Sequence, residues 1–197
     1  MSAELIRHYD LLIEEGNDPV LDPPALRAYM DKWDGEALFE QLSLGKEKSV
    51  LEIGCGTGRL AIRVAPLVRS FYGIDISPKT VEIAKKHLHF DNVSLVCGDF
   101  LEHQFDEKFD LVYSSLTFMH VEDKARAIDT VRGLLKRGGR FVLSIDKSRD
   151  IVLNYGTRSL KIYPDTPENI TELLLRAGFT DVLNGETELA YLISATL

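Results

Sequence analysis

Short apolar runs alternate along the chain with stretches in which apolar residues recur every three or four positions. The runs have the length of β-strands and lie at 48–54, 70–75, 93–97, 109–114 and 139–146. The runs FDLVYSS and RFVLSI are continuous, which is typical of strands that helices cover on both faces. The alternation therefore predicts an α/β fold with a doubly wound, mostly parallel sheet.

Helical periodicity fills most of the intervals between these runs. It predicts helices at 58–69, 78–89 and 122–136. The second begins at Ser77 and Pro78, a capping residue followed by proline at the first helical position. The third ends at Gly138 and Gly139. These helices are the expected crossovers between parallel strands.

The two ends of the chain depart from this alternation. Residues 3–16 and 23–44 have helical patterns before the first strand and predict a cover over the sheet. A helix is expected around 167–177, and the NGE sequence at 184–186 predicts a hairpin between two final strands. The sheet is therefore expected to finish with an antiparallel strand.

Composition adds few restrictions on partners. The 197 residues predict one domain over 1–197, with a helical cover at 1–47 and a core at 48–197. A net charge of -8 argues against nucleic acid as a partner.

No stretch has the ~20 apolar residues of a membrane span, so we expect a cytoplasmic protein with no membrane partner. Cys55 and Cys97 lie outside any zinc-binding pattern and are expected to be reduced thiols.

The sequence VLEIGCGTGRL, residues 50–60, places three glycines directly after the first predicted strand. Ligands of open parallel sheets bind beyond the carboxyl ends of the strands, and glycines there let backbone N–H groups approach a ligand closely. A dinucleotide fingerprint would require glycine at position 59, which is Arg59, and the phosphate-loop pattern is absent from the sequence. The acid within the strand, Glu52, favours a ligand that carries positive charge.

This stretch resembles motif I of the class I S-adenosylmethionine-dependent methyltransferases, and the resemblance continues from Val50 to the C-terminal strands. It implies a Rossmann-like sheet of seven strands, the last antiparallel, with helices on both faces. It also implies S-adenosylmethionine as cofactor and S-adenosylhomocysteine as product. The residues that it implies for cofactor binding in this motif are Glu52, Gly54, Cys55, Gly56, Thr57 and Gly58.

Two further motifs extend the resemblance. At the end of the second strand, Asp75 would accept the ribose hydroxyls, and Ile76 would lie against the adenine. After the third strand, Asp99 would accept the adenine amino group, and Gly98 and Phe100 would flank the ring. Structural alternatives remain open: Asp75 as a helix cap, Asp99 in a simple turn, and Glu52 as a buried acid bound by main-chain N–H groups.

The fourth motif follows the strand at 109–114. The resemblance implies that the backbone of Ser114 and Ser115 lies near the transferred methyl group. The acids of metal-dependent methyltransferases are missing there, so no metal is predicted, and the turn typical of enzymes that methylate DNA bases is absent. The DPPA sequence at 22–25 is interpreted as the start of a helix.

Candidates for the chemistry itself are few, because a sulfonium already carries an excellent leaving group. His120 is the candidate catalytic base, with Asp146 as an alternative. Tyr9, Tyr155, Arg158 and Tyr163 are candidate substrate contacts or simply residues that cover the core. We expect a small-molecule acceptor. Two other functions stay open, a regulatory protein that binds the cofactor without catalysis and an NAD(P)-dependent oxidoreductase.

Overall fold

The computed structural model describes residues 3–197, so the first two residues of the predicted cover lie outside the described residues. Seven strands form one sheet in the order β3-β2-β1-β4-β5-β9-β8. Their bounds are β1 Ser49–Ile53, β2 Ser70–Asp75, β3 Val93–Cys97, β4 Phe109–Ser115, β5 Leu135–Asp146, β8 Thr180–Glu186 and β9 Ala190–Thr196. The helices are α1 Ala3–Glu14, α2 Pro24–Met30, α3 Gly35–Leu42, α4 Ala61–Val64, α5 Pro78–His87, α6 Lys124–Leu134 and α7 Pro167–Arg176.

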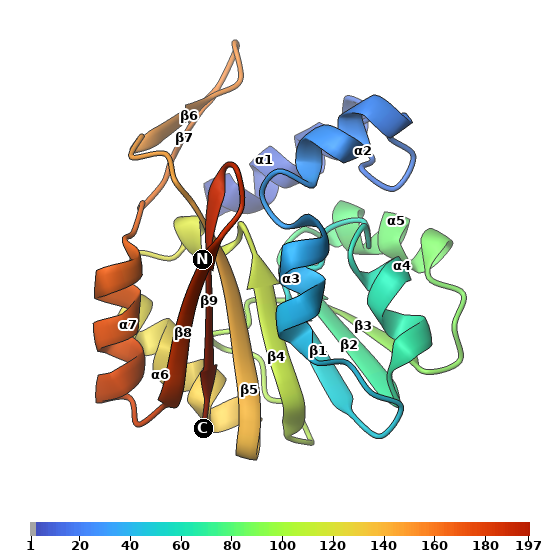
Figure 1. The fold of residues 1–197 in the computed structure, drawn as a ribbon. Coiled ribbons are helices and arrows are strands. Elements are labelled where there is room, and N and C mark those ends of the chain that lie inside the picture. The colour runs from blue at the N-terminus through green and yellow to red at the C-terminus, as the bar shows by residue number, and fades with distance from the viewer. Residues whose placement is uncertain (1–2) are drawn as a thin grey trace.

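The strand pairing confirms the predicted sheet. Strands β1 to β5 pair in parallel, and β9 runs antiparallel between β5 and β8. The strand order reverses between β1 and β4, which is where open α/β sheets place their ligands. Figure 1 shows α1 and α2 lying across this end of the sheet.

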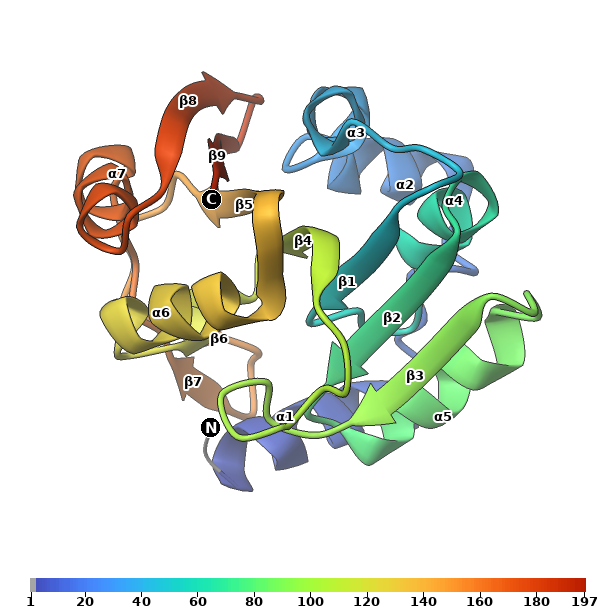
Figure 2. The same ribbon diagram turned by 90° about the horizontal axis from the view of Figure 1, so that it is seen from below.

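Helices cover the sheet from two sides. Figure 2 shows α3 and α4 on one side and α6 and α7 on the other. Neighbouring residues of β1 point to opposite sides, as strand geometry requires. Val50 packs in the cluster that contains Leu38 of α3, and Leu51 packs in the cluster that contains Ile128 of α6. The centre of the sheet at β1 is therefore buried on both faces.

Two predicted helices are shorter than expected. The helix predicted at 58–69 is reduced to α4 and a 3-10 turn at Ala65–Leu67, because Gly58 has a φ of +100° and Pro66 lacks an amide donor. The predicted helix 23–44 is split into α2 and α3. The break lies at Asp34, whose side chain caps α3 at the N–H of Gly35.

The predicted hairpin turn at 184–186 is wrong. Asn184 and Gly185 belong to β8 and pair with Ile193 and Leu192 of β9. The chain turns at 187–189 instead, where Thr187 exchanges hydrogen bonds with Ala190. A Cβ at 185 would lie 3.0 Å from the side-chain nitrogen of Gln41 in α3, so a larger residue there would require this side chain to shift.

The segment 147–165 contains a small hairpin. Its strands are β6 Val152–Asn154 and β7 Ser159–Lys161, joined by a turn in which Gly156 has a φ of +72°. The strand predicted at 139–146 begins four residues earlier, at Leu135, because it is paired with Phe109 of β4. Within residues 3–197, none of the helices is long and apolar enough to cross a bilayer.

Candidate active site

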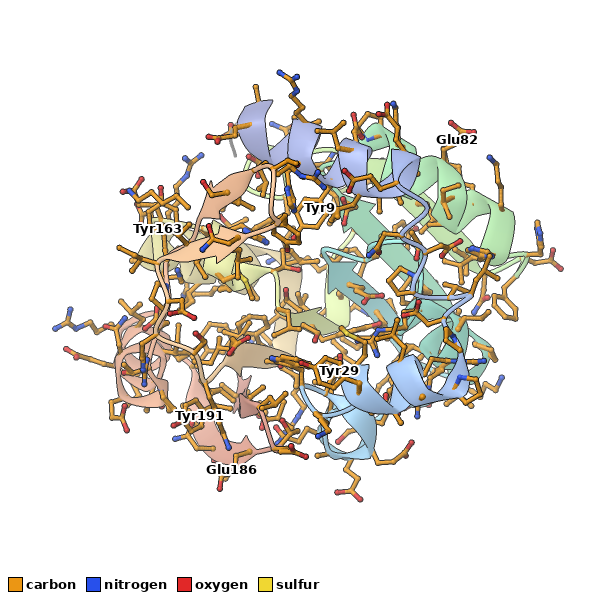
Figure 3. The ribbon with its side chains drawn as sticks, turned by 90° about the horizontal axis from the view of Figure 1, so that it is seen from above. Tyr9, Tyr29, Glu82, Tyr163, Glu186 and Tyr191 are labelled. Carbon is orange, nitrogen blue, oxygen red and sulfur yellow. The ribbon has the colours of Figure 1, made fainter. Side chains whose placement is uncertain are left out.

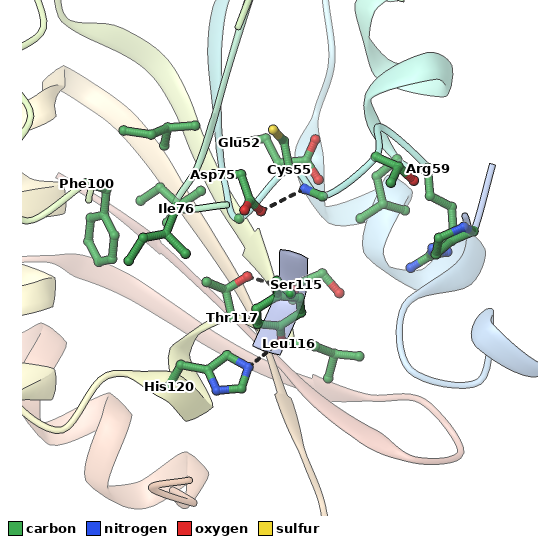
Figure 4. A pocket seen from close by; sticks show the side chains of 18 of the residues that line it. Glu52, Cys55, Arg59, Asp75, Ile76, Phe100, Ser115, Leu116, Thr117 and His120 are labelled. Atoms are coloured by element: carbon green, nitrogen blue, oxygen red, sulfur yellow. Dashed lines mark hydrogen bonds between the residues drawn. The ribbon is translucent and has the colours of Figure 1, made fainter. Parts of the chain in front are cut away.

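A cavity of about 240 Å³ lies at the carboxyl ends of β1, β2 and β4. Its floor is formed by the glycine loop after β1 and by the segment 115–117 after β4. Its roof comes from the cover, through Leu5 and Tyr9 of α1, Pro19 and Met30. Figure 4 shows Glu52 and Asp75 on one side of this cavity and His120 on the other.

Gly54 and Gly56 have different reasons to be glycine. Both have positive φ, +76° and +56°. A Cβ on Gly54 would lie 1.9 Å from Oγ1 of Thr117, so the loops after β1 and β4 pack directly on each other. A Cβ on Gly56 would meet no protein atom within 4 Å. Gly56 therefore leaves bare backbone at the cavity, where a ligand can approach it.

Glu52 and Tyr113 form a buried pair beside the cavity. The Tyr113 hydroxyl donates to Oε2 of Glu52 at 2.9 Å. Burial raises the pKa of Glu52 to about 8 even though this hydrogen bond opposes the shift. Glu52 is therefore mostly protonated at pH 7 in the ligand-free protein, and a cation placed next to it would favour its ionised form.

Asp75 ends β2 and shapes the glycine loop. Its Oδ2 accepts the N–H of Gly56 at 3.0 Å, and its Oδ1 accepts the N–H of Ser77 at 3.0 Å. Burial raises its pKa above the ordinary value, against these backbone hydrogen bonds. Ser77, not Asp75, caps α5, since its hydroxyl accepts from the N–H of Thr80. Asp75 and Ile76 both line the cavity.

The structure brings most of the sequence-predicted site residues together. Those that line the cavity are Glu52, Gly54, Cys55, Gly56, Thr57, Asp75, Ile76, Gly98, Phe100, Ser115 and His120. The hydroxyl of Thr57 is buried without a hydrogen-bond partner, and burial raises the pKa of the Cys55 thiol.

Three predicted residues do not line the cavity. Gly58 packs against Leu88, to which a Cβ would come within 3.1 Å. Ser114 is fully buried and donates to the carbonyl of Ile53 at 2.9 Å. Asp99 accepts the N–H of Leu101 at 3.0 Å. In this structure these three residues lie behind the cavity surface and support it.

Asp34 and Arg59 form an ion pair that was not predicted. The Asp34 carboxylate is fully buried and binds both Nη atoms of Arg59. It also accepts the hydroxyl of Ser115 at 3.0 Å and the N–H of Gly35 at 2.7 Å. One carboxylate thus joins the cover to the glycine loop and to the end of β4. Arg59 and Ser115 are themselves part of the cavity wall.

Tyr9 of α1 reaches His120 across the cavity, and Figure 3 shows Tyr9 above the sheet. The Tyr9 hydroxyl lies 2.6 Å from Nε2 of His120. Burial lowers the pKa of His120 to about 4, so the imidazole is neutral at pH 7. Its Nδ1 is buried with no hydrogen-bond partner. Burial also raises the pKa of Tyr9 above its ordinary value.

Contacts on two sides hold α1 over the cavity. On one side, Asp10 accepts the hydroxyl of Ser77 at the start of α5, at 2.7 Å. On the other side, Arg158 of the β6-β7 hairpin binds both oxygens of Glu15 at 2.5 and 2.6 Å. The Arg158 Nε also donates to Nδ1 of His8 at 3.2 Å. The cover is thus attached to both rims of the site.

Asp146, the alternative base, has partners of its own. Its Oδ2 accepts the indole N–H of Trp33 at 2.9 Å, and its Oδ1 accepts the N–H of Ser148 at 2.6 Å. Among residues 3–197, no group of three or more His, Cys, Asp or Glu side chains is arranged to hold a metal ion.

Residues 44–163 match the profile of the methyltransferase domain family, and the chain belongs to this family. It is 34% identical over 125 residues to a malonyl-[acyl-carrier protein] O-methyltransferase of Priestia megaterium, a match that covers 59% of this chain and 45% of the relative. It is 32% identical over 112 residues to the mitochondrial ubiquinone biosynthesis O-methyltransferase of Schizosaccharomyces pombe, with coverage of 54% and 41%. The chain spans about half the length of the curated relatives it matches.

Solved structures share the fold. A DhpI-SAM-HEP complex has a TM-score of 0.76 and 22% sequence identity to this chain. The match covers 100% of this chain and 99% of the chain in that complex. A putative S-adenosylmethionine-dependent methyltransferase from Listeria monocytogenes has a TM-score of 0.73 and 20% identity, with coverage of 82% and 95%. At these identities the comparison establishes the Rossmann-like architecture.

Proposed function

We propose that this protein transfers a methyl group from S-adenosylmethionine to a small-molecule acceptor. The observation that carries the proposal is the cavity at the point where the strand order reverses. There the structure combines a buried acid, a loop of bare backbone and a carboxylate at the end of β2. The malonyl-[acyl-carrier protein] and ubiquinone biosynthesis O-methyltransferases among its relatives support methyl transfer to oxygen.

The residues present fit the proposed cofactor. Glu52 is protonated in the ligand-free protein and would ionise beside the ammonium or sulfonium group of the cofactor. The hydroxyl of Thr57, which has no hydrogen-bond partner, would gain one from the cofactor. Asp75 would accept the ribose hydroxyls, while Ile76 and Phe100 would contact the adenine. The cation on the cavity wall, Arg59, would face the carboxylate of the methionine end.

The chemistry that the cofactor supplies is an electrophilic methyl group on a good leaving group. The chain must therefore orient the two reactants and exclude water. Tyr9, Leu5 and Met30 close the cavity from above and thereby exclude water. His120 is the proposed proton acceptor, and Tyr9 fixes the orientation of its ring through Nε2. Because the pKa of His120 is low, acidic hydroxyl and carboxyl groups suit this site better than aliphatic alcohols.

The acceptor side is formed by the cover and by the β6-β7 hairpin. We infer a small acceptor, because α1 is attached to both rims of the site. We also propose that residues 1–197 act as one methyltransferase domain with the cover at 1–47. A cytoplasmic location is proposed because Cys55 and Cys97 are both free thiols.

Calorimetric titration with S-adenosylmethionine, S-adenosylhomocysteine and NAD tests the proposal. We expect saturable binding of the first two, and Asp75→Ala should weaken it at least about tenfold, as expected for loss of a charge-assisted hydrogen bond. Asp91→Ala, on the exposed loop before β3, is the matched control and should bind normally.

Turnover is measured as release of S-adenosylhomocysteine across a panel of acidic hydroxyl and carboxyl acceptors. Binding of NAD alone would overturn the proposal in favour of an oxidoreductase. Cofactor binding without turnover on any acceptor would favour a regulatory protein.

A further inference from the structure

A second, smaller cavity lies next to the candidate active site. It has a volume of about 30 Å³ and lies between the ends of β4 and β5, the hairpin and the segment that follows β7. Leu116 lines this cavity and also the larger one. Leu116 is therefore part of the wall of both cavities.

The polar groups at the second cavity are already bonded. Lys124 donates to the carbonyls of Val121 and Tyr163 at 2.5 and 2.8 Å. Ser144 donates to the carbonyl of Trp33 at 3.0 Å. Asp146, as described above, is bound by Trp33 and Ser148. The cavity thus offers no strong polar contact to a ligand.

What remains is an apolar wall, formed by Met119, Ile145, Leu153, Ile162 and Pro164 together with Leu116. Small cavities of this kind stay dry and take apolar groups.

The backbone holds Leu116 in its place. Its φ of +55° is unusual for a residue other than glycine, and its N–H donates to the carbonyl of Ser144 at 3.2 Å. The neighbouring Thr117 packs against Gly54, so the segment has little room to shift toward the glycine loop. Leu116 is thus fixed from both sides.

We propose that Leu116 is a specificity-determining residue that separates the second cavity from the methyl-transfer site and so limits the acceptor to molecules without an apolar arm on the β4 side. The proposal rests on the proposed function, because it assigns the acceptor to the larger cavity. It predicts that shortening Leu116 joins the two spaces and admits an arm of one or a few methylene groups.

The experiment measures binding of the normal alcohols from methanol to hexanol to the protein saturated with S-adenosylhomocysteine, by NMR titration. In the unaltered protein, affinity should stop rising after the first carbons. In Leu116→Ala it should continue to rise about fourfold for each further methylene, which is the gain expected for burying one. Leu116→Met, of similar volume, is the matched control and should behave like the unaltered protein.

Filling the second cavity from another wall locates the effect. Leu116→Ala combined with Ile162→Phe, or separately with Leu153→Phe, should lose the added gain while S-adenosylhomocysteine binds as it does to Leu116→Ala alone. Equal affinities in Leu116→Ala and the unaltered protein would overturn the proposal, and so would a gain that survives both filling substitutions. Failure of the proposed function would appear separately, as failure of S-adenosylhomocysteine to bind at all.

Discussion

The Asp34–Arg59 pair makes a prediction about stability that does not depend on ligand identity. Asp34→Asn keeps the size of the side chain but leaves the Arg59 guanidinium without its buried carboxylate. Breaking a buried ion pair costs about 3–5 kcal/mol. Arg59 is still 18% exposed and keeps Asp31 at 3.8 Å, so the expected loss is smaller, about 2–4 kcal/mol.

Urea unfolding at pH 7, followed by circular dichroism, measures this loss. For a protein of this size, it corresponds to a melting temperature about 5–15 °C lower. Glu36→Gln is the matched control, because Glu36 lies in the same helical turn and pairs with Arg63 at the surface with an 82% exposed side chain. The control should cost less than about 1 kcal/mol.

A double substitution separates the charge from the loss of packing. In Asp34→Asn combined with Arg59→Met, no cation is left without a partner, so the loss should be at least about 1 kcal/mol smaller than the sum of the single losses. The reasoning is refuted if Asp34→Asn and Glu36→Gln destabilise the protein equally.

The remaining predictions concern the cavity. Gly54→Ala should cost at least about 2 kcal/mol in urea unfolding because of its clash with Thr117, whereas Gly56→Ala should cost about 1–2 kcal/mol, since only its φ opposes a side chain. The contribution of Glu52 to the free energy of unfolding of the ligand-free protein should fall as pH rises from about 5 to 8, by up to about 1.4 kcal/mol per pH unit, because the pKa of Glu52 is higher in the folded state; it is measured as the difference between the unaltered protein and Glu52→Gln, and a difference that stays constant with pH would contradict this. His120 acts in the opposite direction: its pKa is lowered on folding, so stability should be lost as pH falls from about 6.5 to 4, and less steeply in His120→Gln.

The central strands β1 and β4 were predictable because they are buried on both faces. Burial on both sides requires runs that are apolar at successive positions, and such runs are visible without any structure. The glycines were predictable for a related reason. The left-handed φ values of Gly54 and Gly56 restrict those positions to few residue types, so backbone conformation is visible in the sequence.

The contacts made by Asp34 could not be predicted in this way. Its partners Arg59 and Ser115 are 25 and 81 residues away, and nothing in the sequence links either of them to position 34. The predicted position of the hairpin turn was wrong for a different reason. Asn184 and Gly185 are typical turn residues, but here they pair with Ile193 and Leu192 inside a strand.

The position of β9 has a consequence for synthesis of the protein on the ribosome. Strand β8 is translated before β9 but hydrogen-bonds to no other strand in the described chain. Until β9 has been released from the exit tunnel, the edge of β5 stays open and β8 has no place in the sheet. Until β9 emerges, the nascent chain therefore carries an exposed edge strand, the state in which chaperones protect such edges from aggregation.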